Sequence, residues 1–166
     1  MSDKQFVLKA LNAIPPFASG IIIFYLTSIK ENKISKLNTL KERMTLLYIP
    51  FYKFYYRKML YKNDLSSFSD EIIKEVFDLL SNNLHNMDTK SQLLYTDFYL
   101  AFCDLLKACD GNAGYFLSEC NYCLDKAFNN LSLQLLREYK GICRKLRLPK
   151  PIMPNVYNRR SLRQDT

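Results

Sequence analysis

The sequence predicts an all-α protein, in which an N-terminal transmembrane helix is followed by a bundle of about four helices. Three observations carry this prediction. The chain has 166 residues, 48% of them hydrophobic, which suffices for one domain with a buried core. It has only four glycines, and no Asn-Gly or Asp-Gly turn joins alternating strands, so a β-fold is disfavoured. Apolar residues instead repeat at helical spacing along most of the chain.

The first element is an uncharged segment of twenty residues, Ala10 to Ile29, framed by Lys9 and Lys30. A helix of this length, at ~1.5 Å per residue, spans the ~30 Å hydrocarbon core of a bilayer. Residues 20–26 are strongly apolar, whereas Pro15 and Pro16 weaken the first half. We therefore expect a transmembrane anchor. A buried core helix and a dimerising or partner-binding helix remain alternatives, while a cleaved signal peptide fits poorly because no small-x-small site follows.

The charge distribution predicts how this anchor is oriented. The net charge is +8: residues 30–62 hold nine Lys or Arg against two acids, 63–143 hold six against twelve, and 144–166 hold seven against one. Basic residues thus follow the apolar segment closely, and the positive-inside rule places everything after Lys30 in the cytoplasm, beside the anionic inner leaflet. Five cysteines, an odd number on predicted helices, suggest reduced thiols and agree with a cytoplasmic location. We expect a single-pass protein of the cell membrane.

The second helix starts in the basic region and is interrupted by a proline. Its apolar positions alternate in spacings of three and four: Leu37, Leu40, Met44, Leu47, Phe51 and Phe54. Pro50 predicts a break or kink near residues 48–49, with the proline opening the next helix. Residues 47–61 mix aromatic and basic side chains, which suits a core helix with a polar outer face, an anionic membrane surface or single-stranded nucleic acid.

Three further helices complete the predicted bundle. Asp70 and Glu71 follow serines and open a helix with an apolar face to Leu84. Asp88 or Thr89 caps the next helix, with Gln92 as the capping-box partner of Thr89. The segment 110–114 breaks the chain, and a long helix with apolar periodicity runs from 116 to 146. The predicted organisation is an N-terminal segment 1–29, a cytoplasmic bundle 30–148 and a Pro/Arg-rich extended tail 149–166.

Candidate contact residues lie in the aromatic and basic segment and in the tail. We predict that they touch a membrane surface or a partner: Lys53, Tyr55, Tyr56, Arg57, Lys58, Arg159, Arg160 and Arg163. A merely solubilising tail is the alternative for the last three.

Candidate catalytic chemistry is weak, and we expect no enzyme, no cofactor and no metal. Cys120 and Cys123 form a lone C-x-x-C inside a predicted helix, where both fit the apolar face, and no second pair lies at ligand spacing. His85, the single histidine, ends a predicted helix, where capping is the simpler role. Asp97 and Asp104 share a helix face without a histidine partner.

Two stretches resemble patterns in small uncharacterised bacterial single-pass membrane proteins. Residues 47–52, LYIPFY, resemble an "LYxPLY" pattern that follows the apolar segment in these proteins. Glu138-Tyr139 and the stretch 144–149, RKLRLP, resemble their closing "EYxxL…KKLGxP" pattern. The resemblance implies a single-pass topology and a bacterial origin, and it carries no functional residue.

The function that follows is a membrane-anchored protein-interaction module, a scaffold, sensor or regulatory partner without catalytic activity. A homo-oligomer is one expected assembly. The first alternative is a soluble helical protein that binds nucleic acid through 30–62 and 144–163. The second is a thiol or metal protein that uses Cys120 and Cys123.

Overall fold

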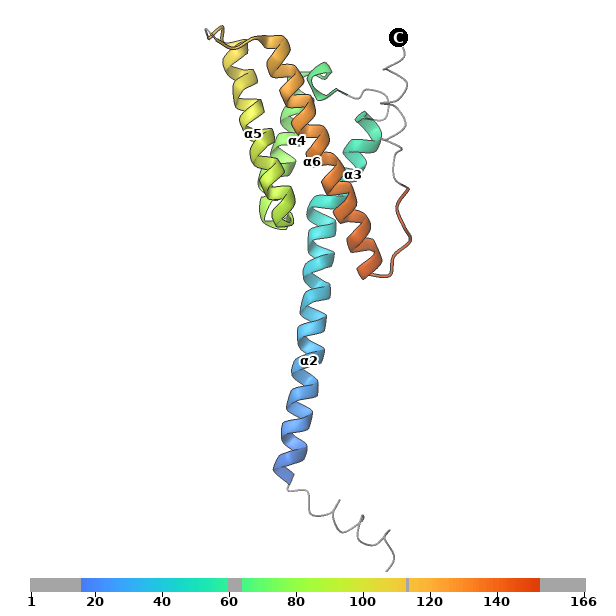
Figure 1. Cartoon of the computed structure of the whole chain (residues 1–166). Helices are drawn as coiled ribbons and strands as arrows, with labels where there is room; N and C mark the ends of the chain where they lie inside the picture. Colours follow the sequence, from blue (N-terminus) through green and yellow to red (C-terminus); the bar gives the residue numbers. More distant parts are fainter. Residues whose placement is uncertain (1–15, 60–63, 113, 153–166) are drawn as a thin grey trace, which may run out of the picture. The chain divides into compact units, whose positions relative to one another are not determined.

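The computed structural model describes residues 16–59, 64–112 and 114–152, and these residues form helices without a strand (Figure 1). The prediction of an all-α protein with about four longer helices is confirmed. The chain divides into two compact units, residues 1–39 and 40–166. Each unit is described by itself.

The described part of the first unit is helix α2, Pro16–Arg43, whose last four residues belong to the second unit. Its apolar residues face solvent on every side of the helix: Ile21, Ile23, Phe24, Tyr25, Leu26 and Ile29. None of the helices that the structure describes has the length and apolar character needed to cross a bilayer. Of the predicted span, residues 10–15 lie outside the described residues. The predicted boundary after residue 29 falls inside α2, and the division lies ten residues later.

Within the second unit, Pro50 perturbs the helical course of the chain. A π-helical turn, η1 (Met44–Tyr48), leads into α3 (Ile49–Phe54), which holds Pro50 in its first turn. The wider turn follows from proline chemistry, because Pro50 lacks an N–H and its ring clashes with the carbonyl four residues back. A second π-helical turn, η2 (Tyr55–Met59), follows. The interruption predicted at 48–49 is thus a change of helical pitch rather than a loop.

The remaining helices form a packed group with α3. They are α4 (Asp70–Asn82), α5 (Thr89–Cys109) and α6 (Leu117–Lys145). A short 3₁₀ turn, η3 (Leu65–Ser67), precedes α4, and another, η4 (Leu84–Asn86), joins α4 to α5. Figure 1 shows α5 and α6 side by side. Phe77 of α4 stacks on Phe102 of α5, with 4.7 Å between the ring centroids. Gly111 and Gly114 adopt positive φ in the turn between α5 and α6, so the break predicted at 110–114 is confirmed.

Three phenylalanines from three helices meet at the centre of the core. The ring centroid of Phe128 in α6 lies 5.6 Å from that of Phe98 in α5 and 6.4 Å from that of Phe51 in α3. All three side chains are almost fully buried. Such offset and edge-on contacts add to the hydrophobic stabilisation that burial provides. The α3 segment is therefore part of the core and not a peripheral arm.

Hydrogen bonds hold η3 against α6 and close the C-terminal end of α6. The Asp125 side chain in α6 accepts hydrogen bonds from the Ser66 N–H at 2.8 Å and the Ser66 hydroxyl at 2.7 Å, and so fixes η3 against α6. At the other end, α6 terminates with Arg147 at φ 57°. The Leu148 N–H donates to the Cys143 carbonyl at 2.9 Å, which closes a Schellman-type cap at a position that usually favours glycine.

Helix α5 starts at one of the two predicted N-cap residues, but without the predicted capping hydrogen bonds. Asp88 is the N-cap residue, but its side chain makes no cap hydrogen bond, because it forms an ion pair with Arg43 instead. Gln92 donates to the carbonyls of Leu84 and Met87 and not to a capping-box partner. The capping-box prediction is therefore wrong. A charge-assisted pair with an arginine is a stronger interaction for this carboxylate than a local backbone N–H.

Candidate functional site

The structure separates the predicted contact residues of the aromatic and basic segment. Lys53 and Arg57 are exposed, and Tyr56 and Lys58 are half-buried. Tyr55 is 7% exposed and packs against Phe51 in the core, so its placement at a membrane or partner surface is corrected. Arg159, Arg160 and Arg163 lie outside the described residues. What remains of the predicted surface is a short basic edge on α3 and η2.

The start of the tail lies against this same segment. The hydroxyl of Tyr52 donates to the Ile152 carbonyl at 2.8 Å, and the Tyr56 hydroxyl donates to the same oxygen. The Tyr52 ring lies 4.6 Å from Tyr56 and 5.0 Å from Tyr139 of α6. Burial, followed by the neighbouring tyrosines, raises the pKa of Tyr52. The predicted tail thus begins as a segment held on an aromatic cluster.

A buried glutamate is the centre of the most connected polar cluster among the described residues. Glu138 of α6 is 8% exposed, although it carries a carboxyl group. Its oxygens accept hydrogen bonds from the hydroxyls of Tyr48 (2.8 Å) and Ser91 (2.7 Å) and from the Gln134 amide (2.9 Å). Burying a carboxylate is costly unless hydrogen bonds replace its water, and here three donors from three helical segments do so.

Arg43, the last residue of α2, extends the cluster toward the surface. Its Nη2 donates to the Tyr48 hydroxyl at 3.0 Å and to Asp88 Oδ1 at 2.6 Å, and its Nε donates to the Asn86 carbonyl at 2.7 Å. Tyr48 therefore bridges an arginine and a glutamate. Burial and the adjacent Glu138 together raise the pKa of Tyr48, so its hydroxyl stays protonated and can donate. The cluster joins η1, the η4 turn, α5 and α6 at one point.

The sequence interpretation missed Glu138 as a functional position, although a signal was present. A lone acid stands in the apolar stripe of a long helix, and buried acids are rare unless they are paired. Both stretches singled out by the resemblance also meet here. Tyr48 of LYIPFY binds Glu138, and Tyr52 stacks near Tyr139. These short motifs are therefore two sides of one packing contact.

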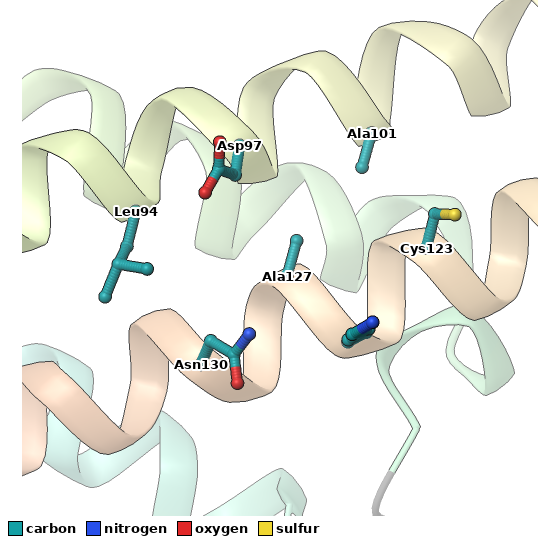
Figure 2. A pocket seen from close by; sticks show the side chains of 7 residues that line it. Leu94, Asp97, Ala101, Cys123, Ala127 and Asn130 are labelled. Atoms are coloured by element: carbon teal, nitrogen blue, oxygen red, sulfur yellow. The ribbon is translucent and has the colours of Figure 1, made fainter.

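A second feature is an open pocket of about 250 Å³ between α5 and α6 (Figure 2). Leu94, Asp97 and Ala101 line it from α5, and α6 contributes the rest: Cys123, Lys126, Ala127 and Asn130. The small side chains of the two alanines leave room between the helices, and Asp97, Lys126 and Asn130 supply the polar part of the lining. The pocket brings together one exposed thiol, one acid and one cation, without a histidine.

The thiols do not resemble a reactive pair. Cys120 is buried and its pKa is raised, first by burial and then by nearby Asp104, whereas a nucleophilic thiol needs a lowered pKa. Cys123 is exposed, so the expectation that both cysteines pack in the core is corrected for this residue. Across the described ranges, no group of three His, Cys, Asp or Glu residues is placed to hold a metal ion. His85 is exposed in η4 and contacts the Asn86 amide.

Fold and site together define a small helical-bundle protein with a buried polar cluster and a shallow interhelical pocket. No protein-family model matches the chain, and no curated protein or solved structure is significantly similar to it.

Proposed function

We propose that the chain is a membrane-anchored helical module that acts through protein–protein contacts and without catalysis. One observation supports it most. The apolar residues of α2 between 21 and 29 are exposed on all sides of the helix; Phe24, for example, is 76% exposed. Apolar side chains that are exposed on all sides of a helical segment are stabilised by an apolar surrounding, either protein or lipid. Burial of each of these side chains yields roughly 1.5–3 kcal/mol at most, so a lipid environment stabilises them strongly.

The sequence around these residues supports a membrane as that surrounding. The uncharged stretch continues back to Ala10, so its twenty residues match the ~30 Å thickness of the hydrocarbon core. Lys30, Lys33 and Lys36 then follow in the exposed continuation of α2. Cations placed there pair with anionic headgroups and favour a cytoplasmic location of the bundle.

Fractionation of cells that express full-length variants tests the anchor. The double variant Ile23→Lys/Leu26→Lys places two charges in the apolar part of α2, where each costs up to about 2.5–3.5 kcal/mol, the value at a bilayer centre. The matched control, Ile34→Lys/Leu37→Lys, adds the same charge at the same spacing farther along α2. We expect the unmodified chain and the control to resist carbonate and high-salt washes, and the test variant to be released.

Either of two results would contradict the anchor: a full-length chain released by the washes, or equal behaviour of the two double variants. Release would favour nucleic-acid binding through 30–62 and 144–163, which steep salt dependence would reveal. Orientation has its own readout, because Cys109 and Cys123 are exposed. A membrane-impermeant maleimide should label these thiols only after permeabilisation if the bundle is cytoplasmic.

A further inference from the structure

The outer face of α5 and α6 combines a hollow with projecting side chains. Leu93 and Leu100 of α5 are 66% and 56% exposed, and they are seven residues apart with Asp97 between them. This spacing puts all three on one side of the helix, and Asp97 among them lines the α5/α6 pocket. A cavity of 150 Å³ already admits a ligand the size of benzene, so a pocket of about 250 Å³ has room for a leucine side chain. The face therefore offers both projecting leucine side chains and a pocket that can receive one.

Two charges of opposite sign stand on this face. Asp97 on α5 and Lys126 on α6 both line the pocket, and both are exposed. The ion pairs found among the described residues are Arg43–Asp88 and Lys107–Asp104, so neither Asp97 nor Lys126 is neutralised there. In Figure 2, Asp97 projects from α5 on one side of the hollow, opposite the α6 residues. The face is thus complementary in charge to a copy of itself.

From this complementarity we propose that two copies of the chain associate through the α5/α6 face about a twofold axis. A twofold interface is self-complementary: if Asp97 meets Lys126 of the partner subunit, Lys126 meets the partner subunit's Asp97. One rotation thus forms two ion pairs and places a leucine of each copy over the other's pocket. The homo-oligomer expected from the sequence thereby acquires a defined surface.

The size of the face is compatible with such a dimer. A 21-residue helix such as α5 is ~31 Å long, and two helices 8–10 Å apart present a face ~20 Å wide. Contact over this area buries roughly 600 Å² per copy, or ~1,200 Å² in total, the lower end of specific interfaces. We therefore expect a reversible dimer and not an obligate one.

Two differently tagged full-length copies, co-expressed and purified in one non-ionic detergent, test the interface by charge reversal. Asp97→Lys paired with itself brings two cations together at each contact, and Lys126→Asp paired with itself brings two acids together. Each self-pairing replaces both ion pairs by like-charge contacts, so we expect co-purification to fall at least about tenfold, the effect of losing even one modest coupling energy. In the mixed pair, Asp97→Lys with Lys126→Asp, both contacts across the axis join a cation to an acid, so we expect this pair to co-purify as well as the unmodified chain.

A double variant provides a second rescue. Asp97→Lys/Lys126→Asp, paired with itself, exchanges the two charges within each copy, so both contacts across the twofold axis again join a cation to an acid. We expect this double variant to co-purify as well as the unmodified chain. Recovery by the double variant, after loss in each single variant, is the signature of a direct contact between the two positions.

The matched control reverses charges on α4, where Lys74 and Asp78 are exposed. Lys74→Asp and Asp78→Lys should leave co-purification unchanged. Since all four positions are exposed, each variant should keep the unmodified thermal midpoint, which separates lost association from lost folding. Equal recovery of all variants, or loss in the double variant, would overturn the proposed interface. If Ile23→Lys/Leu26→Lys abolishes co-purification and the reversals do not, association belongs to α2.

The proposed interface and the proposed membrane anchor are tested by separate measurements, so either can be contradicted without the other. Fractionation reports on α2, whereas rescue by the double variant reports on α5 and α6. A chain released by carbonate can still show the rescue, and a chain that resists carbonate can still lack it.

Discussion

Removal of one hydroxyl, in Tyr48→Phe, tests whether the buried polar cluster holds the helices together. The phenyl ring keeps its packing in the core, so the change isolates the hydrogen bonds. The lost bonds are those from the Tyr48 hydroxyl to Glu138 at 2.8 Å and to the Asn86 carbonyl at 3.3 Å, and the one from Arg43 to the same hydroxyl at 3.0 Å. Arg43 keeps its hydrogen bonds to Asp88 and to the Asn86 carbonyl, so the free energy lost at Arg43 is small.

The loss of stability depends mainly on Glu138, the carboxylate that is left without one of its donors. A hydrogen bond to a charged group contributes about 1.5–3 kcal/mol, and Glu138, 8% exposed, has little water to replace the missing donor. We expect Tyr48→Phe to lower the free energy of unfolding by roughly 2–3 kcal/mol. At ~3 °C per kcal/mol for a chain of this size, the thermal midpoint should fall by ~6–9 °C.

Near-UV circular dichroism is the appropriate assay, because the chain has twelve tyrosines and no tryptophan, and tyrosine signals report core packing. Tyr52→Phe is the matched control, since its hydroxyl donates to the backbone carbonyl of Ile152 at an exposed position. The control should change stability by less than ~1 kcal/mol. A double-mutant cycle with Glu138→Gln should give a coupling of at least ~1 kcal/mol. If Tyr48→Phe and the control agree within ~0.5 kcal/mol, the cluster does not fasten the fold.

Three further outcomes are expected. Phe128→Ala should destabilise the fold by about 3–5 kcal/mol because it empties the centre of the core, whereas Tyr122→Ala on the exposed side of the same helix should change it by less than ~0.5 kcal/mol in the same thermal melts. Arg147→Gly should raise stability by roughly 0.5–1 kcal/mol, since glycine adopts φ 57° without the Cβ clash; a lower thermal midpoint would contradict this. Alkaline pH should destabilise the protein: the raised pKa of Tyr48 means that, above the ordinary tyrosine pKa near 10, the unfolded chain loses a proton that the folded chain keeps, so stability is full below pH ~10 and declines above it. Titration to about pH 12 should show a shallower decline for Tyr48→Phe, whose own alkaline sensitivity comes from other buried tyrosines.

Helical periodicity was sufficient to predict the class of the fold and the places where helices start and stop. The long helix expected from 116 to 146 is α6, Leu117–Lys145, and the break at 110–114 contains two glycines at positive φ. These features are local: the position of an apolar stripe depends on 3.6 residues per turn, and a glycine turn depends on the conformational freedom of one residue. The sequence also identified Pro50 as an interruption, since the missing N–H is a property of proline alone.

Long-range partners were not predictable in the same way. Asp88 was expected to cap α5, but it pairs with Arg43, 45 residues away, and Tyr55 was expected at the surface, but it lies in the core. Glu138 is one acid among twelve in residues 63–143, and its three donors come from η1, α5 and α6. The sequence by itself determined which segments are helical and which of their faces are apolar, because both depend on neighbours along the chain. Only the tertiary structure decided which polar side chains are buried together, because that depends on how the helices pack, and the free energy of a buried charge depends on every donor that packing places around it.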